Sequence, residues 1–216
     1  MKLDWCPETA TKAFLDTVET CKVVYNESSV AEMVSAMAAG WNAKLIVEAW
    51  SQGGMMATSI GLAIASHHSG GRHVCIVADE ASRSKYIQAM EKAGKSPEVI
   101  VGEPEDAMNG LEGIDFMVVD CRCNDFARIF KVAKLGEKGA VLIRKNALAK
   151  AESDFRWRTA LDAKARIVRS VLLPVGKGLD VAHVGARGGN SVPRKGERRW
   201  IKYIDRQTGE EFIIRK

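Results

Sequence analysis

The sequence predicts an α/β protein built on one doubly wound, mostly parallel sheet. Short, nearly all-apolar segments recur along the middle of the chain, segments with a helical pattern lie between them, and glycines mark most of the joints. Strands that are apolar on both faces are typical of parallel sheets covered by helices on both sides. The 216 residues are enough for one domain with a proper core.

Two helices are expected before the first strand. The first covers 7–24 and has a proline and a glutamate in its first turn. Ser28 or Ser29 can cap the second helix, and Glu32 can complete a capping box from Ser29. Apolar residues then recur at helical spacing until Gly40 ends this helix.

Strands and helices alternate after this point. The expected strands are 45–49, 73–77, 98–101, 115–119, 140–144, 166–173 and 179–184. The expected helices are 55–66, 81–93, 104–110, 124–134 and 152–164. Gly176-Lys177-Gly178 reads as a tight turn between the last two strands, so the sheet should close with an antiparallel hairpin strand.

The excess of positive charge lies at the C-terminus. Residues 187–216 carry nine Lys/Arg and four Asp/Glu, whereas the rest of the chain carries 23 of each. We therefore expect a domain over 1–184 and a basic extension over 185–216, with a small hairpin around Thr208-Gly209. Basic residues beside an aromatic can hold phosphates or single-stranded bases. The candidates are Arg194, Lys195, Arg198, Arg199 and Trp200. Acidic residues interrupt this run and favour a solvated linker.

The five cysteines and the N-terminus indicate the compartment. An odd number of cysteines without a secretory signal favours reduced thiols in the cytoplasm, with the nucleus left open. No apolar run reaches the length of a membrane span, so we expect no membrane partner. His67, His68 and His73 lack cysteine or acidic neighbours at metal-ligand spacing, and we expect them at the surface.

Several stretches, taken in order, resemble the class I S-adenosylmethionine-dependent methyltransferase fold. They are KLIVEAWSQGG (44–54), EVIVGEPEDAM (98–108), DFMVVDC (115–121), GAVLIRKNAL (139–148) and LLPVGKGLDVA (172–182). The resemblance is closest to small-molecule O-methyltransferases of the caffeoyl-CoA type, and it covers about Ser28 to Val184. The whole chain resembles a plant family of methyltransferase-like proteins whose activity is not established.

This resemblance implies a cofactor, S-adenosylmethionine or S-adenosylhomocysteine, at the carboxyl ends of the first and fourth strands. The implied cofactor-binding residues are Glu48, Trp50, Ser51, Gly53, Gly54, Asp79, Glu103 and Asp120. Glu48 would bind the cofactor's amino group or hold the amides of the turn. An ungapped match puts Val77 at the position where the family has an acid for the ribose hydroxyls, and a shifted turn could supply either Asp79 or Glu80. No catalytic base is identified.

The glycine-rich turn departs from the family pattern. The family has acidic-x-Gly-x-Gly-x-Gly, and this chain has Trp50, Gln52 and Gly54 at the glycine positions. Glycine is useful there because the backbone approaches the cofactor closely. We expect Trp50 and Gln52 to point toward the methionine half of the cofactor and to narrow the pocket.

The metal site of the caffeoyl-CoA type is also altered. Asp120 matches the first aspartate of that site, but Lys145-Asn146 stands where the family has an Asp-Asn pair. Hard cations need anionic oxygen ligands, so no metal is expected. The Lys145 ammonium either pairs with Asp120 in the place of a metal or is solvated at the strand end.

Two classes of function remain open. The first is a metal-independent methyltransferase that acts on the oxygen of a small molecule. The alternative is a non-catalytic binding or scaffold protein, a pseudoenzyme, on the same fold. Its tail would bind nucleic acid or an acidic partner. A small-molecule ligand is the expected partner, and a homodimer is left open.

Overall fold

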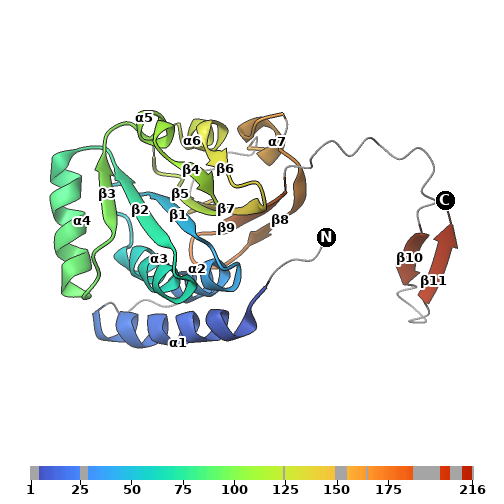
Figure 1. Cartoon of the computed structure of the whole chain (residues 1–216), viewed down its shortest axis with the longest axis horizontal. Helices are drawn as coiled ribbons and strands as arrows, with labels where there is room; N and C mark the ends of the chain where they lie inside the picture. The colour runs from blue at the N-terminus through green and yellow to red at the C-terminus, as the bar shows by residue number, and fades with distance from the viewer. Residues whose placement is uncertain are drawn as a thin grey trace.

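A seven-stranded sheet with helices on both faces forms the body of the computed structural model (Figure 1). The structure describes residues 5–24, 29–123, 125–148, 155–163, 165–186, 200–204 and 211–215. The strands of this sheet are β1 (Leu45–Ala49), β2 (Arg72–Val77), β3 (Glu98–Val101), β5 (Phe116–Asp120), β7 (Gly139–Lys145), β8 (Ile167–Leu173) and β9 (Leu179–Gly185). Their order is β3-β2-β1-β5-β7-β9-β8. The five neighbouring strands β3, β2, β1, β5 and β7 pair in parallel, whereas β9 pairs antiparallel with β7 and β8. This topology confirms the predicted fold class.

The helices form a layer on each side of the sheet (Figure 1). The α1–α4 side holds α1 (Pro7–Val24), α2 (Val30–Gly40), α3 (Met56–Ser69) and α4 (Glu80–Lys92). The α5–α7 side holds α5 (Pro104–Asn109), α6 (Phe126–Val132) and α7 (Trp157–Ala160). Two separate clusters of buried apolar side chains fill the two interfaces, so consecutive residues of a strand enter different clusters.

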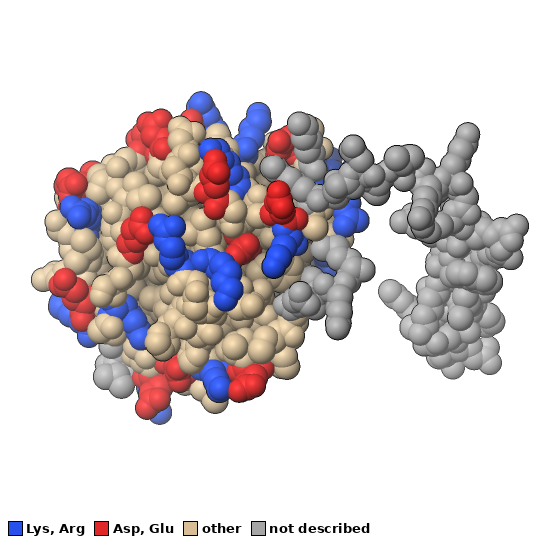
Figure 2. Space-filling model, in the orientation of Figure 1, with Lys and Arg blue, Asp and Glu red and all other residues tan. Residues whose placement is uncertain are grey.

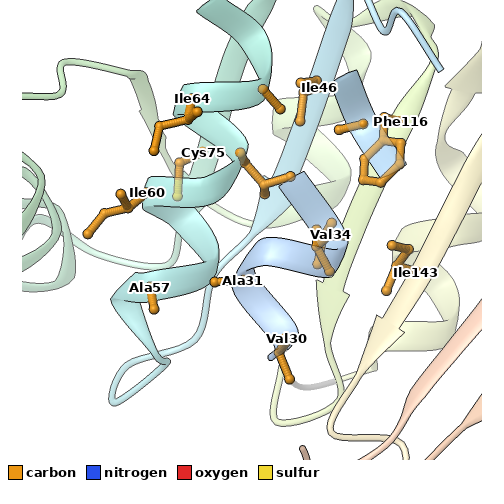
Figure 3. Close-up of a cluster of buried hydrophobic side chains, with 14 of the residues drawn as sticks. Val30, Ala31, Val34, Ile46, Ala57, Ile60, Ile64, Cys75, Phe116 and Ile143 are labelled. Carbon is orange, nitrogen blue, oxygen red and sulfur yellow. The ribbon is translucent and has the colours of Figure 1, made fainter. Parts of the chain in front are cut away.

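Figure 3 shows the cluster on the α1–α4 side. Val34 of α2, Ile60 of α3, Ile46 of β1 and Phe116 of β5 all belong to this cluster. α2 begins as predicted, because the Ser29 amide donates to Glu32 Oε2 at 2.6 Å. This packing fixes the start of α2 and of α3 near the carboxyl ends of the strands.

Two expectations about local structure are wrong. The helix expected over 124–134 is shorter, because β6 (Lys134–Leu135) pairs in parallel with an unpredicted strand, β4 (Glu112–Ile114). Within the described residues, the helix expected over 152–164 is reduced to the single turn of α7. In both places pairing or packing with distant segments overrides the local helical pattern.

The C-terminal tail contains the expected hairpin, formed by β10 (Trp200–Ile204) and β11 (Glu211–Arg215) in antiparallel pairing. Its expected turn and the basic residues before Trp200 lie outside the described residues. In the part of the chain that the structure describes, every helix is too short or too polar to cross a lipid bilayer. Figure 2 shows acidic and basic side chains interspersed over one face of the body.

Candidate functional site

The parallel strands bring most of the predicted site residues to one edge of the sheet. The turn 50–55 follows β1, Asp79 follows β2, Glu103 follows β3 by two residues, and Asp120 ends β5. Ligands of doubly wound folds bind at this carboxyl edge, where strand ends and helix N-termini meet.

The turn after β1 is arranged around the Trp50 indole. Trp50 is 7% exposed, and its ring packs edge-on against Tyr86 of α4, with 5.6 Å between centroids. A Cβ atom at Gly54 would lie 2.5 Å from Trp50 Nε1, so this glycine makes room for the indole. Gln52 is exposed. The indole is therefore part of the core, which differs from the expected orientation toward the methionine half of a cofactor.

The opposite side of this turn is open. Gly53 has φ +78°, and a Cβ atom there would meet nothing within 4 Å. Among the described residues, three polar atoms of the turn and of the first turn of α3 are buried without a hydrogen-bond partner. They are Trp50 Nε1, Ser51 Oγ and Thr58 Oγ1. Buried polar groups normally have partners, so this turn has unused hydrogen-bonding capacity.

Glu48 is enclosed by residues of the α1–α4 side. Its carboxylate accepts hydrogen bonds from Ser59 Oγ at 3.0 Å and Tyr86 Oη at 3.2 Å. Burial alone would raise the pKa of Glu48, but the His73 ring and the charge of Lys145 hold it below its ordinary value. In this structure Glu48 holds α3 and α4 against β1. Its contact with a cofactor stays a prediction.

The expectation that His73 lies at the surface is wrong. His73 is 5% exposed, and its Nε2 lies 3.5 Å from Glu48 Oε2. His67 is exposed as expected, and His68 is half-buried beside Asp16. His73 differs from His67 and His68 because it is the second residue of β2, and the alternation of that strand directs its side chain into the core.

Asp79 and Glu103 lie at the starts of helices. Asp79 Oδ1 accepts from the Ser82 amide at 2.6 Å and so caps α4. Its hydrogen bonds with Ser82 lower the pKa of its carboxyl, so Asp79 is anionic at neutral pH. Glu103 is the exposed N-cap residue of α5 and follows Gly102, which has φ +143°. Both acids are positioned on the β2–β3 half of the edge.

Asp120 is the most heavily bonded group at the edge. Its Oδ1 accepts from the Arg122 amide at 3.0 Å, Arg122 Nε at 3.1 Å and Asn146 Nδ2 at 2.8 Å. Its Oδ2 accepts from Arg122 Nη2 at 2.7 Å. The other arm of the guanidinium donates to the Gly53 carbonyl at 2.9 Å. Arg122 therefore ties the turn after β5 to the turn after β1.

Strand register places Lys145 beside Asp120. The two residues are direct neighbours in the β5–β7 pairing, so their side chains lie on the same face. Lys145 Nζ is 3.8 Å from Asp120 Oδ2. Of the two alternatives for Lys145, the structure has the one in which the ammonium pairs with Asp120. Burial would raise the pKa of Asp120, but Arg122 and Lys145 hold it below its ordinary value.

Sequence reasoning missed Arg122 and Tyr86. The available signal for Arg122 was its distance of two residues from Asp120, which allows both its amide and its guanidinium to reach the same carboxylate. No local signal marks Tyr86, because its contact with Glu48 joins residues 38 positions apart. Among the described residues, no group of three or more His, Cys, Asp or Glu is arranged to hold a metal ion.

A family model described as "Protein of unknown function (DUF1442)" matches residues 1–216. No curated protein matches the sequence. The comparison with known families therefore supplies membership of a family but no activity.

Several solved structures share the fold. The O-methyltransferase TomG from Streptomyces achromogenes, solved in complex with SAM, is 21% identical with TM-score 0.57, over 81% of this chain and 90% of that one. An O-methyltransferase from Bacillus cereus in complex with SAH is 20% identical with TM-score 0.55, over 82% and 90%. A methyltransferase from Geobacter sulfurreducens is 20% identical with TM-score 0.56, over 81% and 88%. At these identities the likeness establishes the methyltransferase fold alone.

Proposed function

The chain belongs to the family described as "Protein of unknown function (DUF1442)", and we propose that it is an S-adenosylmethionine-dependent methyltransferase. The cofactor, or S-adenosylhomocysteine after the reaction, lies at the carboxyl ends of β1 and β5. The acceptor is an oxygen atom of a small molecule, and no metal takes part.

One observation carries this proposal: the open turn at Gly53, Asp79 and Asp120 converge on one edge of a methyltransferase-fold sheet. The residues present fit the cofactor. The open φ-positive glycine allows a close approach of the ligand, the unpartnered Ser51 hydroxyl offers a hydrogen bond, and Asp79 offers a carboxylate for ribose hydroxyls. The complexes of TomG with SAM and of the Bacillus cereus enzyme with SAH support the same assignment.

The cofactor supplies an electrophilic methyl group on a positively charged sulfur. The chain's own contribution is to position the reactants and to exclude water. Gly53 and Ser51 would hold the methionine half, whereas Asp79 and Glu103 would hold the adenosine half. Trp50 supports the turn from beneath through its contact with Tyr86.

Lys145 accounts for the absence of metal from this proposal. Its ammonium places a positive charge 3.8 Å from Asp120 Oδ2. A divalent ion bound there, as in enzymes of the caffeoyl-CoA type, would need a second carboxylate at this position. Magnesium or calcium is therefore not expected to stabilise the protein specifically. The cytoplasmic location, the plant origin and the separate tail after residue 184 stay predictions from the sequence.

Calorimetric titration with S-adenosylhomocysteine tests the proposal. We expect saturable binding near micromolar, about −8 kcal/mol. Asp79→Asn should weaken binding at least tenfold while the Asn side chain still caps α4. Glu91→Gln, an exposed change near the other end of α4, is the matched control and should bind as the wild type does. Absence of heat and of thermal shift at millimolar ligand would remove the cofactor from the proposal. Binding without methyl transfer to any acceptor would favour the non-catalytic alternative.

A further inference from the structure

A cleft adjoins the Asp120–Lys145 pair, and its walls suggest what the acceptor is. It has a volume of about 270 Å³. Its apolar walls come from Val30 of α2, Met55 before α3, and Val175 and Leu179 around the β8–β9 turn. Met55 follows Gly54 directly, so the cleft begins where the proposed cofactor turn ends. Such a mixture of apolar walls and a few polar groups is typical of small-molecule sites.

The ammonium of Lys145 lines this cleft without a hydrogen bond to any described residue. Lys145 is 4% exposed, and among the described residues the one carboxylate oxygen within 4 Å of its Nζ belongs to Asp120, at 3.8 Å. Asp120 already accepts four hydrogen bonds from Arg122 and one from Asn146. One carboxylate therefore serves two cations, and the Lys145 ammonium, at 3.8 Å from it, is left able to donate to a further anionic group at the cleft.

The charged residues that line the cleft are both basic. Lys177 lies in the β8–β9 turn and lines it together with Lys145. None of the described residues that line the cleft is acidic. A ligand with an apolar body and one anionic oxygen group matches both the walls and the charge.

The same residues decide between a hydroxyl acceptor and a carboxylate acceptor. A neutral hydroxyl must lose a proton during methyl transfer, so it needs a base within reach. The cleft has no described histidine or carboxylate in its lining, and Asp120 is occupied by Arg122 and Asn146. A carboxylic acid is already ionised at neutral pH, because its pKa is about 4, and needs no base.

We propose that this cleft binds a small carboxylic acid with an apolar body and that Lys145 positions its carboxylate, so that the product is a methyl ester. This inference rests on the proposed function. One carboxylate oxygen accepts from the Lys145 ammonium. The other forms a bond to the methyl carbon while the bond from that carbon to the sulfonium sulfur breaks, and the electron pair stays on sulfur. The carboxylate and the sulfonium give a neutral ester and a neutral thioether, and no proton is transferred.

Binding of two probes of nearly the same shape tests the site without turnover. Phenylacetate carries the carboxylate, and 2-phenylacetamide is its neutral counterpart. In calorimetric titrations of the whole chain, phenylacetate should bind saturably and at least tenfold more tightly than the amide. Equal affinities, or no binding of either probe, would overturn the inference.

Two variants locate the effect. Lys145→Met keeps the length of the side chain and removes the charge, and it should abolish the preference for phenylacetate. Lys138→Met is the matched control, because Lys138 is an exposed residue before the opposite end of β7, and it should retain the preference. An unchanged preference in a folded Lys145→Met protein would contradict the assignment. If that variant does not fold, Lys145→Gln and the wild-type comparison of the two probes still decide.

S-adenosylhomocysteine added to the same samples separates the two proposals. Binding of S-adenosylhomocysteine without phenylacetate would overturn the carboxylate site and leave the proposed function standing. Binding of phenylacetate without binding of S-adenosylhomocysteine would overturn the proposed function and leave the carboxylate-binding site standing. With a labelled methyl donor and a mixture of small carboxylic acids, the labelled product should release methanol in mild alkali, as esters do. An alkali-stable product would overturn the inference.

Discussion

Arg144 and Lys145 are consecutive residues of β7, but they face opposite sides of the sheet and have different surroundings. On the α5–α7 side, Arg144 Nη2 lies 3.2 Å from Asp180 Oδ2, and its guanidinium stacks 4.0 Å above the Phe155 ring. Trp157 Nε1 donates to the other oxygen of Asp180 at 2.8 Å. This cation is enclosed by an acid and by aromatic rings from the chain itself.

On the α1–α4 side, Lys145 shares Asp120 with Arg122 and lines a cleft. Both cations are buried, so burial alone does not distinguish them. What differs is what surrounds them: Arg144 faces an acid and aromatic rings of the chain, although its Nε has no hydrogen-bond partner among the described residues, whereas Lys145 faces a cleft. A cation enclosed by side chains of the protein stabilises the fold, whereas a cation that shares its carboxylate and lies beside a cleft is available to a ligand.

Arg144→Ala should have the largest effect on stability. It leaves the half-buried Asp180 without its cation and removes the contact with Phe155, so we expect a loss of about 4 kcal/mol in the free energy of unfolding. Urea denaturation followed by circular dichroism measures it, and Lys138→Ala should change little. A loss below about 1 kcal/mol would show that Arg144 and its neighbours on the α5–α7 side do not stabilise the fold.

Asp120→Asn should cost about 3 kcal/mol in the free energy of unfolding, because Lys145 then remains buried without a carboxylate. Arg122 contributes less to this loss, since its side chain is 40% exposed and can turn to water. The double variant Asp120→Asn with Lys145→Met should regain part of the stability in the same denaturation experiment. A double variant less stable than Asp120→Asn would contradict the shared-carboxylate account.

Gly54→Ala and Gly53→Ala compare the two sides of the turn after β1. At Gly54 the added methyl group meets Trp50 Nε1 at 2.5 Å and the Ser51 carbonyl at 2.8 Å, so we expect a loss of about 2 kcal/mol. At Gly53 the space is open, and only the positive φ costs about 1 kcal/mol. Gly53→Ala should nevertheless weaken S-adenosylhomocysteine binding more than Gly54→Ala does. Thermal denaturation checks the order of the two stability losses, and calorimetry checks the order of the two affinities. A higher affinity in Gly53→Ala than in Gly54→Ala would place the ligand away from Gly53.

The smallest effect concerns acid. The pKa of Asp120 is lower in the folded protein than its ordinary value, so its contribution to stability is present above about pH 4 and is lost as pH falls through the folded pKa. Stability measured between pH 6 and pH 3 should therefore fall less steeply in Asp120→Asn than in the wild type. Equal slopes would mean that Asp120 is not held as a carboxylate by its neighbours.

Much of the fold could be predicted from the sequence, because it depends on local patterns of apolar, polar and glycine residues. The boundaries of β1 and β3 were predicted to the residue from apolar runs bounded by polar or glycine residues. The small β4–β6 pair was missed, since its strands lie 19 residues apart and pair only through tertiary structure. The helix around α7 was expected to be longer than it is. Trp157 is held by contacts with Phe130 and Asp180, which lie far from it in the sequence, and not by a helical repeat.

The candidate site was readable only in part. The position of Asp120 at a strand end followed from motif order, and its pairing with Lys145 was one of the two alternatives that the sequence left open. The direction of the Trp50 side chain depends on Tyr86, which lies 36 residues away, and the sequence contains no sign of that contact. Burial of His73 likewise depends on Glu48 from the neighbouring strand.

Hydrogen–deuterium exchange with and without S-adenosylhomocysteine tests the central claim most directly, because it locates a ligand without assuming activity. We predict slower exchange in the turn 50–56 and in residues 119–123, where Arg122 joins the two strand ends. Exchange around Trp157 and Asp180, in the enclosed cluster on the other side of β7, should not change. Protection confined to that cluster, or no protection anywhere at saturating ligand, would contradict the assignment of the open edge as the functional site.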